Sequence, residues 1–289
     1  MSMEQTARAQ RFHQLHSGGR VLVLPNAWDA ASARIIEQAG APAIATTSAG
    51  MAWSLGFADG ERLPVEELLA ACSRICRRVS VPVSVDIERG YGQNPEEVAV
   101  VVGALLKLGI VGVNIEDGVI PGTHVLASPS VLGERIAAIR AVAQKHDVRL
   151  FINARTDTYF VPNDDPAARL EDTVQRALLY VAAGADGIFV PGLAGLDEIV
   201  RIAKRVPRPL NIYAGYAGVP QVAELLRAGV RRVSLGCGPL QAVMALTRRM
   251  AQEAIDQGSY TAMTENMLSA AEANSLFTNR FDPPQAMRL

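Results

Sequence analysis

Two carboxylates follow a short apolar run that begins after Pro82. The run reads Val-Ser-Val, Asp86 and Glu88 come next, and a Gly-Tyr-Gly turn occupies positions 90–92. A β-branched apolar run bounded by Pro and Gly is typical of a buried strand, along which side chains alternate. We therefore expect Asp86 and Glu88 on one side of the strand, at its C-terminal end. Two like charges this close need a compensating cation, so the pattern favours a metal site over a turn with solvated acids.

The elements that position these acids form a repeated unit, an apolar strand followed by a helix. The expected strands are 21–24, 43–48, 82–88, 111–116, 150–155, 187–191, 210–213 and 232–235. The expected helices are 30–38, 64–78, 95–108, 130–145, 167–183, 196–205, 220–227 and 240–256, with a loop at 49–62. Continuous apolar strands are typical of parallel sheets covered by helices. Four helices also end in a Gly that permits a quick return to the sheet, namely Gly40, Gly109, Gly184 and Gly229.

Eight such units predict an α/β fold of the (β/α)8 TIM barrel type. An open doubly wound sheet is the alternative, but no early Gly-x-Gly-x-x-Gly supports it. We expect an N-terminal capping helix at 4–17 and an extra C-terminal helix at 262–277, before Pro283-Pro284. The prediction is a single domain over residues 1–289, with the barrel at about 20–256 and a helical extension at 257–289.

The composition excludes several classes of protein. The 289 residues are 49% hydrophobic with a formal net charge of −1 and no basic block, so no nucleic-acid or membrane partner is expected. No apolar run approaches the roughly 20 residues that span a bilayer, and the polar N-terminus lacks a signal-peptide core. Three cysteines cannot form a disulfide framework, and Cys72 and Cys76 are expected to be ordinary helix residues. A cytoplasmic protein is the expectation.

The ends of the strands carry most of the polar residues that could do chemistry, and in a (β/α)8 barrel the active site lies there. These residues are Thr47, Ser48, Asp59, Asp86, Glu88, Glu116, Asp117, Asn153, Arg155, Asp157, Asn211, Tyr213 and Ser234. Several acids and one arginine suit a divalent cation with an anionic substrate. Arg155 is expected to bind a substrate carboxylate, to pair with Glu116 or Asp157, or to do both. Thr47 and Ser48 offer a hydroxyl and backbone N–H groups to the same anion.

Six segments together resemble the isocitrate lyase/phosphoenolpyruvate mutase superfamily. They are Leu-Pro-Asn-Ala-Trp-Asp-Ala at 24–30, Thr-Thr-Ser-Ala at 46–49, Leu-Gly-Phe-Ala-Asp at 55–59, Val-Asp-Ile-Glu-Arg-Gly-Tyr-Gly at 85–92, Gly-Val-Asn-Ile-Glu-Asp at 112–117 and Asn-Ala-Arg-Thr-Asp at 153–157. Their order and spacing cover roughly residues 20–240. The resemblance implies a (β/α)8 barrel that binds Mg2+, with Mn2+ as an alternative.

The resemblance also implies roles for particular residues. Asp86 would be the direct metal ligand, and Asp59, Glu88 and Glu116 would reach the ion through water. The substrate's 2-oxo carboxylate would contact Arg155, Thr47 and Ser48, with Asp86 and Asn153 beside it. Members tend to be tetramers that often exchange the last barrel helix between subunits, so we expect a homo-oligomer, a dimer or a tetramer. The extra C-terminal helix suits such an exchange.

The reaction depends on the loop at 118–129, which departs from the patterns of the superfamily. It lacks the Lys-x-Cys-Gly-His of the isocitrate and methylisocitrate lyases and the Lys and Asn of the mutase. The remaining chemistry is stabilisation of an enolate, which suffices to decarboxylate an oxaloacetate-like acid. Methylisocitrate-type cleavage, P–C chemistry on a phosphonopyruvate and a non-catalytic carboxylate-binding barrel are the alternatives. If a base is needed, His124 and Tyr213 are the titratable candidates.

Overall fold

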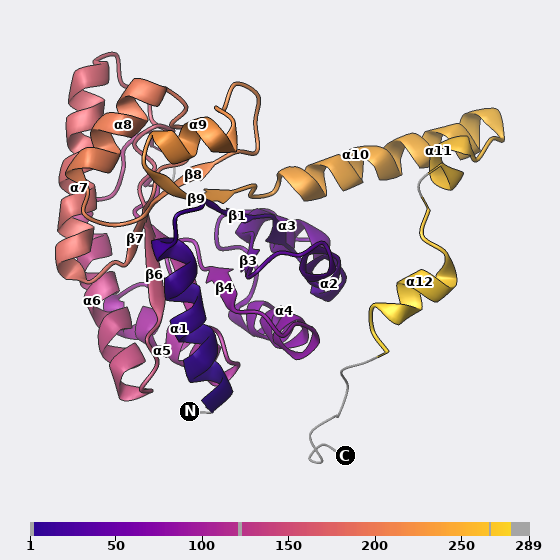
Figure 1. Ribbon diagram of the computed structural model, residues 1–289, viewed down its shortest axis with the longest axis horizontal. Coiled ribbons are helices and arrows are strands. Elements are labelled where there is room, and N and C mark those ends of the chain that lie inside the picture. The colour runs from indigo at the N-terminus through magenta and orange to yellow at the C-terminus, as the bar shows by residue number, and fades with distance from the viewer. Residues whose placement is uncertain (1–2, 121–122, 266, 279–289) are drawn as a thin grey trace.

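A computed structural model describes residues 3–120, 123–265 and 267–278 of the chain. Its strands form one parallel sheet in the order β1-β9-β8-β7-β6-β5-β4-β3-β2. The strands are β1 (Leu22–Leu24), β2 (Asn26–Ala27), β3 (Ile44–Thr46), β4 (Val83–Asp86), β5 (Gly112–Glu116), β6 (Phe151–Arg155), β7 (Gly187–Phe189), β8 (Leu210–Tyr213) and β9 (Val230–Ser234). The expected (β/α)8 barrel is confirmed (Figure 1).

The first barrel strand is divided into two short pieces, which explains why the described residues form nine strands instead of eight. β1 pairs with the last strand, β9, whereas β2 pairs with β3. Pro25 lies between the two pieces and has no N–H group to donate to a neighbouring strand. One half of the first barrel strand therefore pairs with the last strand and the other half with the second, and the sheet closes into a barrel.

Helices cover the outside of the barrel. They are α2 (Ala30–Gln38), α4 (Val65–Arg78), α5 (Pro95–Lys107), α6 (Pro129–Lys145), α7 (Pro166–Ala183), α8 (Leu196–Arg205) and α9 (Val222–Arg227). The four glycines that follow helices have positive φ angles, as expected: 96° at Gly40, 91° at Gly109, 115° at Gly184 and 96° at Gly229. None of the helices in the described ranges is long and apolar enough to cross a membrane.

The N-terminal helix α1 (Met3–Ser17) closes the barrel at the end where the strands begin. Phe12 of this helix is fully buried, and the ring of His16 stacks on the ring of Phe151 at 3.9 Å between centroids. A Cβ at Gly112 would lie 2.7 Å from the Phe12 ring, so a glycine is required where α1 packs against the start of β5. The predicted capping helix is confirmed.

Two expectations about local structure were wrong. Residues Ser48–Ser54 form the helix α3 inside the expected loop at 49–62. Gly50 suggested a loop, but it lies in this helix. A glycine is needed there because a Cβ would come within 2.5 Å of the Thr47 side chain. The expected helix at 262–277 is instead two short helices, α11 (Thr261–Thr264) and α12 (Ala270–Ser275), and the Ser269 side chain caps the second. Pro283-Pro284 lies outside the described residues.

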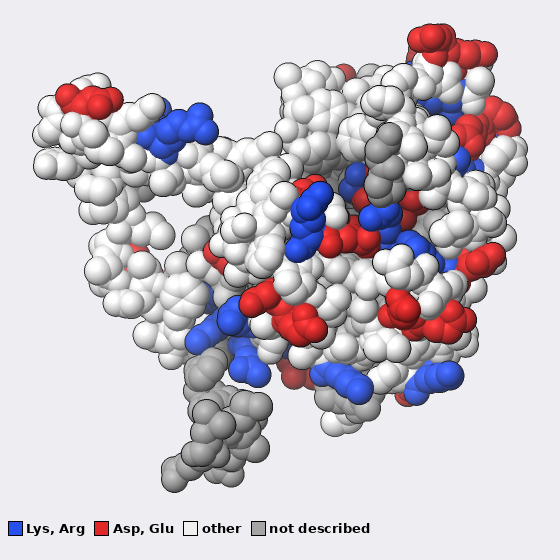
Figure 2. Space-filling view, turned by 180° about the vertical axis from the view of Figure 1, so that it is seen from behind, with Lys and Arg blue, Asp and Glu red and all other residues white. Residues whose placement is uncertain are grey.

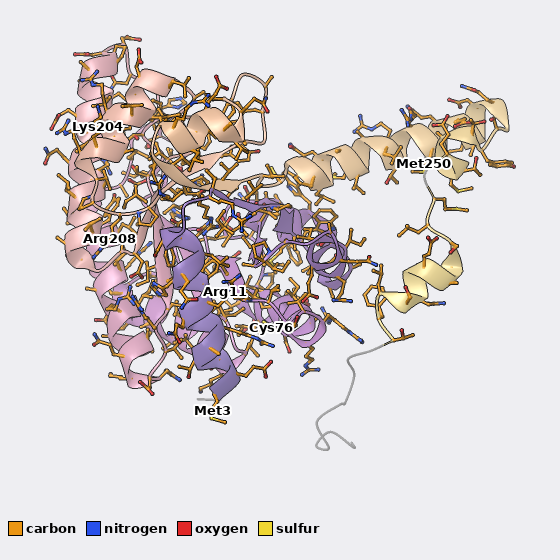
Figure 3. The ribbon with its side chains drawn as sticks, viewed as in Figure 1. Met3, Arg11, Cys76, Lys204, Arg208 and Met250 are labelled. Carbon is orange, nitrogen blue, oxygen red and sulfur yellow. The ribbon has the colours of Figure 1, made fainter. Side chains whose placement is uncertain are left out.

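The last barrel helix, α10 (Gly238–Gln252), points away from the barrel instead of packing on it (Figure 1). Leu240 is the only residue of α10 that is buried, and Met250 lies far out on this arm (Figure 3). The chain then bends through a π-helical turn at Glu253–Gln257 and returns toward the barrel through α12. The side chain of Arg34, in α2, donates to the Leu276 carbonyl at 2.9 Å, which attaches the returning segment.

Candidate active site

A cavity of about 280 Å³ lies at the C-terminal ends of the barrel strands. Its lining residues are Asn26, Thr47, Ser48, Ala49, Asp59, Asp86, Asn114, Arg155, Phe160, Phe189, Pro191, Tyr213, Ser234, Gly236 and Cys237. Figure 2 shows acidic and basic side chains side by side around a hollow in one face of the molecule. The cavity thus brings together seven of the strand-end residues expected in the site, namely Thr47, Ser48, Asp59, Asp86, Arg155, Tyr213 and Ser234.

Asp86 is the last residue of β4, and the neighbouring strand holds it in place. Its backbone N–H donates to Oγ1 of Thr46 at 3.0 Å, and its Oδ2 accepts from the backbone N–H of Ser48 at 3.2 Å. Burial, and then the negative charge of Asp86, raises the pKa of Asp59 on the same cavity wall. The carboxylates of Asp59 and Asp86 therefore repel each other, whereas the sequence pattern predicted a close pair of Asp86 and Glu88.

Glu88 lies just beyond the end of β4, with a left-handed backbone at φ 49°. Its carboxylate accepts hydrogen bonds from the Tyr91 hydroxyl at 2.9 Å and from the backbone N–H of Glu61 at 2.6 Å. Burial, and then the charges of Asp86 and Asp59, raises its pKa to about 7. Because β4 ends at Asp86, the side-chain alternation of the strand does not extend to Glu88, which does not line the cavity. Its carboxylate still interacts electrostatically with Asp86 and Asp59.

Arg155 ends β6 and is held by two acids. Its Nη1 lies 2.8 Å from Oε2 of Glu116, and its Nε and Nη2 donate to the two oxygens of Asp157 at 2.6 and 3.0 Å. The rings of Phe160 and Phe189 lie 5.7 and 5.9 Å from the guanidinium carbon. Burial acts to lower the pKa of Arg155, but the two carboxylates outweigh it and raise the pKa above its usual value. The ion pairs expected as one role of Arg155 are present.

The other predicted residues occupy different positions. Glu116 contacts Arg155 from outside the cavity lining, and burial raises the pKa of Glu116 while that ion pair works against the rise. Asn153 is buried and donates from Nδ2 to Oδ1 of Asn114, which itself lines the cavity, at 2.7 Å. His124 is exposed on the loop after β5 and does not line the cavity.

Tyr213 is the last residue of β8 and lines the cavity. Burial, and then the neighbouring Cys237, raises the pKa of its hydroxyl to about 12. The hydroxyl is therefore protonated at neutral pH and is a hydrogen-bond donor to a substrate rather than a ready base.

Sequence reasoning missed several residues of the cavity wall. Asn26 is one: its Nδ2 donates to the Thr46 carbonyl at 2.8 Å, and its Oδ1 accepts from the backbone N–H groups of Leu235 and Gly236 at 3.0 and 2.8 Å. It thus joins the first, second and last strands. Two signals were available: Asn26 is a polar residue directly after an apolar strand and Pro25, and it lies in the segment 24–30 that carries the family resemblance. Cys237 was missed because it lies between Gly236 and Gly238, a pattern that is equally typical of an ordinary turn and of a residue that lines a cavity.

Asp117 directly follows β5 and supports the site through a set of buried hydrogen bonds. Its side chain accepts from the Thr156 and Tyr180 hydroxyls at 2.7 and 2.8 Å and from the backbone N–H of Asp157 at 3.1 Å. Arg176 pairs with it at 3.1 Å and also donates to the Ala127 carbonyl at 2.9 Å. Asp117 therefore fixes both Asp157, which holds Arg155, and the end of the loop at 118–128.

The acids of the site fit a divalent cation. Among the described residues no three His, Cys, Asp or Glu side chains converge closely enough to hold a metal on their own. The expected arrangement needs only one direct carboxylate ligand, with the remaining positions filled by water and substrate, as is usual for Mg2+. Burial, and then repulsion among the acids, raises the pKa of Asp59 and Glu88. A bound cation would relieve this repulsion.

The fold and this site define a class of protein: a (β/α)8 barrel with an acidic, arginine-containing cavity at the strand ends. The sequence model of the phosphoenolpyruvate phosphomutase family matches residues 12–255, and the chain belongs to that family, within the isocitrate lyase/phosphoenolpyruvate mutase superfamily. The family comprises lyases and mutases, and the relatives differ in the activity that their names state.

Three relatives illustrate this range of activities. A Burkholderia cenocepacia structure, described as a candidate phosphonomutase, is 41% identical with a TM-score of 0.79, and the match covers 85% of this chain and 99% of that one. A 2-methylisocitrate lyase from Aeropyrum pernix is 29% identical, over 87% of this chain and 81% of the relative. An oxaloacetate decarboxylase from Bradyrhizobium sp. is also 29% identical, over 82% of this chain and 81% of the relative.

Proposed function

We propose that the protein is a Mg2+-dependent lyase that breaks a carbon–carbon bond in a small 2-oxo or 2-hydroxy carboxylate through an enolate intermediate. Decarboxylation of an oxaloacetate-type acid is the reaction that the site supports best. The observation that carries this proposal is the position of Arg155, which two acids fix at a cavity that Asp59 and Asp86 also line. Mn2+ is the alternative metal.

The metal site would be formed by Asp86 directly and by Asp59, Glu88 and Glu116 through water. When bound, the cation would supply positive charge where the oxygen of the 2-oxo group becomes negative. Asp86 is suited to the direct role because it lines the cavity and is held by Thr46 and Ser48. Glu88 is suited to an indirect role because its two oxygens already accept hydrogen bonds from Tyr91 and Glu61.

The substrate carboxylate would bind to Arg155. A guanidinium has five N–H groups, and the contacts with Glu116 and Asp157 use three of them. One N–H therefore remains on each terminal nitrogen, the number that a carboxylate needs for a paired contact. Thr47 and Ser48 line the same cavity. The Thr47 hydroxyl would donate to the anion, whereas the backbone N–H of Ser48 already donates to Asp86. These contacts orient the bond to be broken.

Bond cleavage in an oxaloacetate-type acid demands little more of the protein. The leaving group is CO2, which departs without a proton, so the absence of the Cys-containing loop is no obstacle. Tyr213 is protonated at neutral pH and lines the cavity, so it is placed to donate a hydrogen bond or a proton as the enolate is quenched. The relative that is named an oxaloacetate decarboxylase supports this choice.

P–C chemistry on a phosphonopyruvate is the second candidate, because the relative at 41% identity is described as a candidate phosphonomutase. An NMR assay separates the candidates. The protein is mixed with oxaloacetate, isocitrate, methylisocitrate and phosphonopyruvate, each with and without Mg2+, and pyruvate, glyoxylate, succinate and phosphate are followed. Mg2+ alone and an Asp86→Asn variant with Mg2+ are the controls. Pyruvate from oxaloacetate above both controls supports the proposal, and turnover of none of the four substrates contradicts it.

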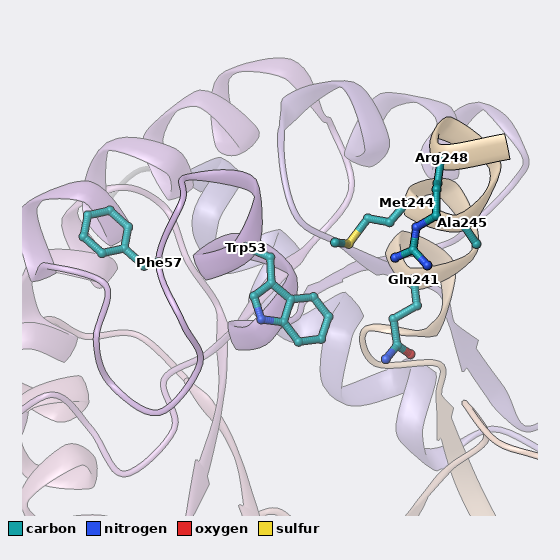
Figure 4. A pocket seen from close by; sticks show the side chains of 6 residues that line it. All are labelled: Trp53, Phe57, Gln241, Met244, Ala245 and Arg248. Atoms are coloured by element: carbon teal, nitrogen blue, oxygen red, sulfur yellow. The ribbon is translucent and has the colours of Figure 1, made fainter. Parts of the chain in front are cut away.

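We further propose that the protein is a homo-oligomer in which α10 packs on a second copy. Trp53 of α3 faces Met244, Gln241 and Arg248 of α10 across a pocket of about 480 Å³ (Figure 4). Val243 and Met244 are 45% and 47% exposed, which leaves apolar surface on the projecting helix. A second copy suits this surface because the eighth helix of a barrel normally covers the barrel wall, and here it projects away from its own.

A further inference from the structure

Arg232 is the largest fully buried side chain among the described residues, and it precedes the cavity residue Ser234 by two positions. It is in β9, where it pairs with Leu22 of β1 and Asn211 of β8. Ser234, two residues later on the same strand, lines the cavity. Because side chains two apart point to the same side of a strand, Arg232 points into the barrel interior, one layer beneath the cavity floor.

The charge of Arg232 has no counter-ion within the described ranges. Its Nε donates to Oγ of Ser234 at 3.2 Å, whereas Nη1 and Nη2 are buried and make no hydrogen bond to any described group. Burial lowers the pKa of Arg232 to about 10, against the opposing influence of Asp86, so the guanidinium is charged at neutral pH. Buried water can satisfy such N–H groups but does not neutralise their charge. A fully buried and unpaired cation is unfavourable for stability.

The contacts of Arg232 also determine how Ser234 presents its hydroxyl. Oγ of Ser234 accepts from Nε of Arg232 at 3.2 Å and from Nδ2 of Asn211 at 3.1 Å. These two donors occupy both lone pairs of the oxygen, so the hydroxyl hydrogen is left to donate. Its acceptor within the protein is Oδ1 of Asn211 at a long 3.3 Å. The cavity floor therefore offers a donor to an incoming oxygen.

The charges around the cavity explain what a buried cation would do there. Asp59 and Asp86 line the cavity, and the charge of Arg155 is already balanced by Glu116 and Asp157. The surroundings thus carry an excess of negative charge, which attracts a metal ion and repels a carboxylate. A fixed positive charge one layer below has the opposite effect on both ligands, and it acts strongly because little water screens it.

We propose that Arg232 is a positioning residue for anion binding: its buried charge, together with the Ser234 hydroxyl that it orients, strengthens carboxylate binding in the cavity and weakens binding of the free divalent cation. The inference rests on the proposed function, because it requires that the cavity binds a carboxylate and a metal. It assigns to the last barrel strand a role in substrate binding, although Arg232 touches neither ligand.

The test uses Arg232→Met, which replaces the charge with an apolar chain of similar length. Arg231→Met is the matched control, since Arg231 is the next residue, points to the other side of the strand and is partly exposed. Calorimetry measures the binding of Mn2+ alone and then of oxalate to the Mn2+-loaded full-length proteins. We expect Arg232→Met to bind Mn2+ roughly three- to tenfold more tightly and oxalate more weakly by a similar factor. Arg231→Met is expected to match the wild type.

Thermal unfolding of the metal-free proteins separates this role from a structural one. Arg232→Met is expected to unfold at or above the wild-type temperature, because an unpaired buried charge has been removed. Should Arg232→Met fail to fold, Arg232→Gln is used instead; it removes the charge and keeps a donor for Ser234, and the same shift in Mn2+ affinity is expected. Oxalate affinity that is unchanged, or Mn2+ and oxalate affinities that fall together, would overturn the inference alone. No oxalate binding to the wild type would overturn the proposed function as well.

Discussion

Arg155 and Asp157 lie two residues apart at the end of β6, and two hydrogen bonds join their side chains. Nε and Nη2 of Arg155 donate to Oδ1 and Oδ2 of Asp157 at 2.6 and 3.0 Å. Asp157 is itself held by Asp117, which accepts from its backbone N–H. The guanidinium is therefore oriented before an anion arrives, so little side-chain entropy remains to be lost on binding. This pre-orientation is the basis of the first prediction.

Arg155→Lys is expected to reduce kcat/KM by about 100-fold or more. A lysine ammonium is a single point donor that cannot reproduce the paired contacts with Asp157 and a substrate carboxylate. Steady-state kinetics on oxaloacetate and the Kd for oxalate provide the measurement. The control is Arg201→Lys on the exposed face of α8, which should leave both values unchanged. Wild-type oxalate affinity in Arg155→Lys would contradict the assigned role.

Asp86→Asn is expected to abolish metal-dependent turnover and to weaken Mn2+ binding by about 100-fold or more, because the direct carboxylate ligand is lost. The metal-free variant should be at least as stable as the wild type, since the repulsion with Asp59 is relieved. Calorimetry with Mn2+ and thermal unfolding test the two parts separately. Asp197→Asn, at an exposed position in α8, is the matched control. Full turnover by Asp86→Asn after chelator treatment would refute the metal assignment.

The stability of the protein should depend on the protonation of His16. Burial, and then the charge of Arg232, lowers the pKa of His16 to about 3 from a usual value of 6.5. Between these values the unfolded chain binds a proton that the folded protein does not bind. The contribution of His16 to the free energy of unfolding is therefore intact above pH 6.5 and falls by up to about 1.4 kcal/mol per pH unit as the pH drops toward 3.

His16→Asn removes the titrating group and keeps a donor for the Phe12 carbonyl, which Nδ1 contacts at 2.8 Å in the wild type. Urea unfolding at pH 5, 6, 7 and 8 gives the free energy at each pH. Between pH 6.5 and 5 the free energy of unfolding should fall more for the wild type than for His16→Asn. At pH 8 the variant should have the lower free energy of unfolding, because the stacking of His16 on Phe151 is lost. Identical slopes for the two proteins would show that His16 does not titrate as expected.

Met244→Asp is expected to shift the protein toward the monomer. The substitution places a charge on the half-exposed apolar face of α10, which we propose packs on a second copy. Sedimentation velocity at micromolar protein measures the change, and the wild type should sediment as a dimer or tetramer. Val100→Asp is the control, because Val100 is 74% exposed on α5, away from the arm. A monomeric wild type would exclude the proposed exchange of α10.

Sequence patterns alone predicted the barrel and most of its elements. Apolar runs of strand length, helices that end in Gly and the position of Pro82 before a strand are local signals, and local backbone preferences decide them. The same reasoning placed Asp86 and Arg155 at strand ends, because parallel strands of a barrel all end on one face. Local reasoning failed at α3, where Gly50 is required by close packing against Thr47 and not by a turn.

Only the tertiary structure decided which polar residues share the cavity. Asn26 and Cys237 lie on its wall because barrel closure brings the first strand beside the last, and no local pattern records a neighbour more than 200 residues away. The direction of α10 was likewise open, since an amphipathic helix can pack on its own barrel or on another. The sequence by itself determined the strand ends and their acids, because alternation and turns are local. The buried charge of Arg232, the ion pairs of Arg155 and the membership of the cavity depend on contacts across the barrel, which folding alone creates.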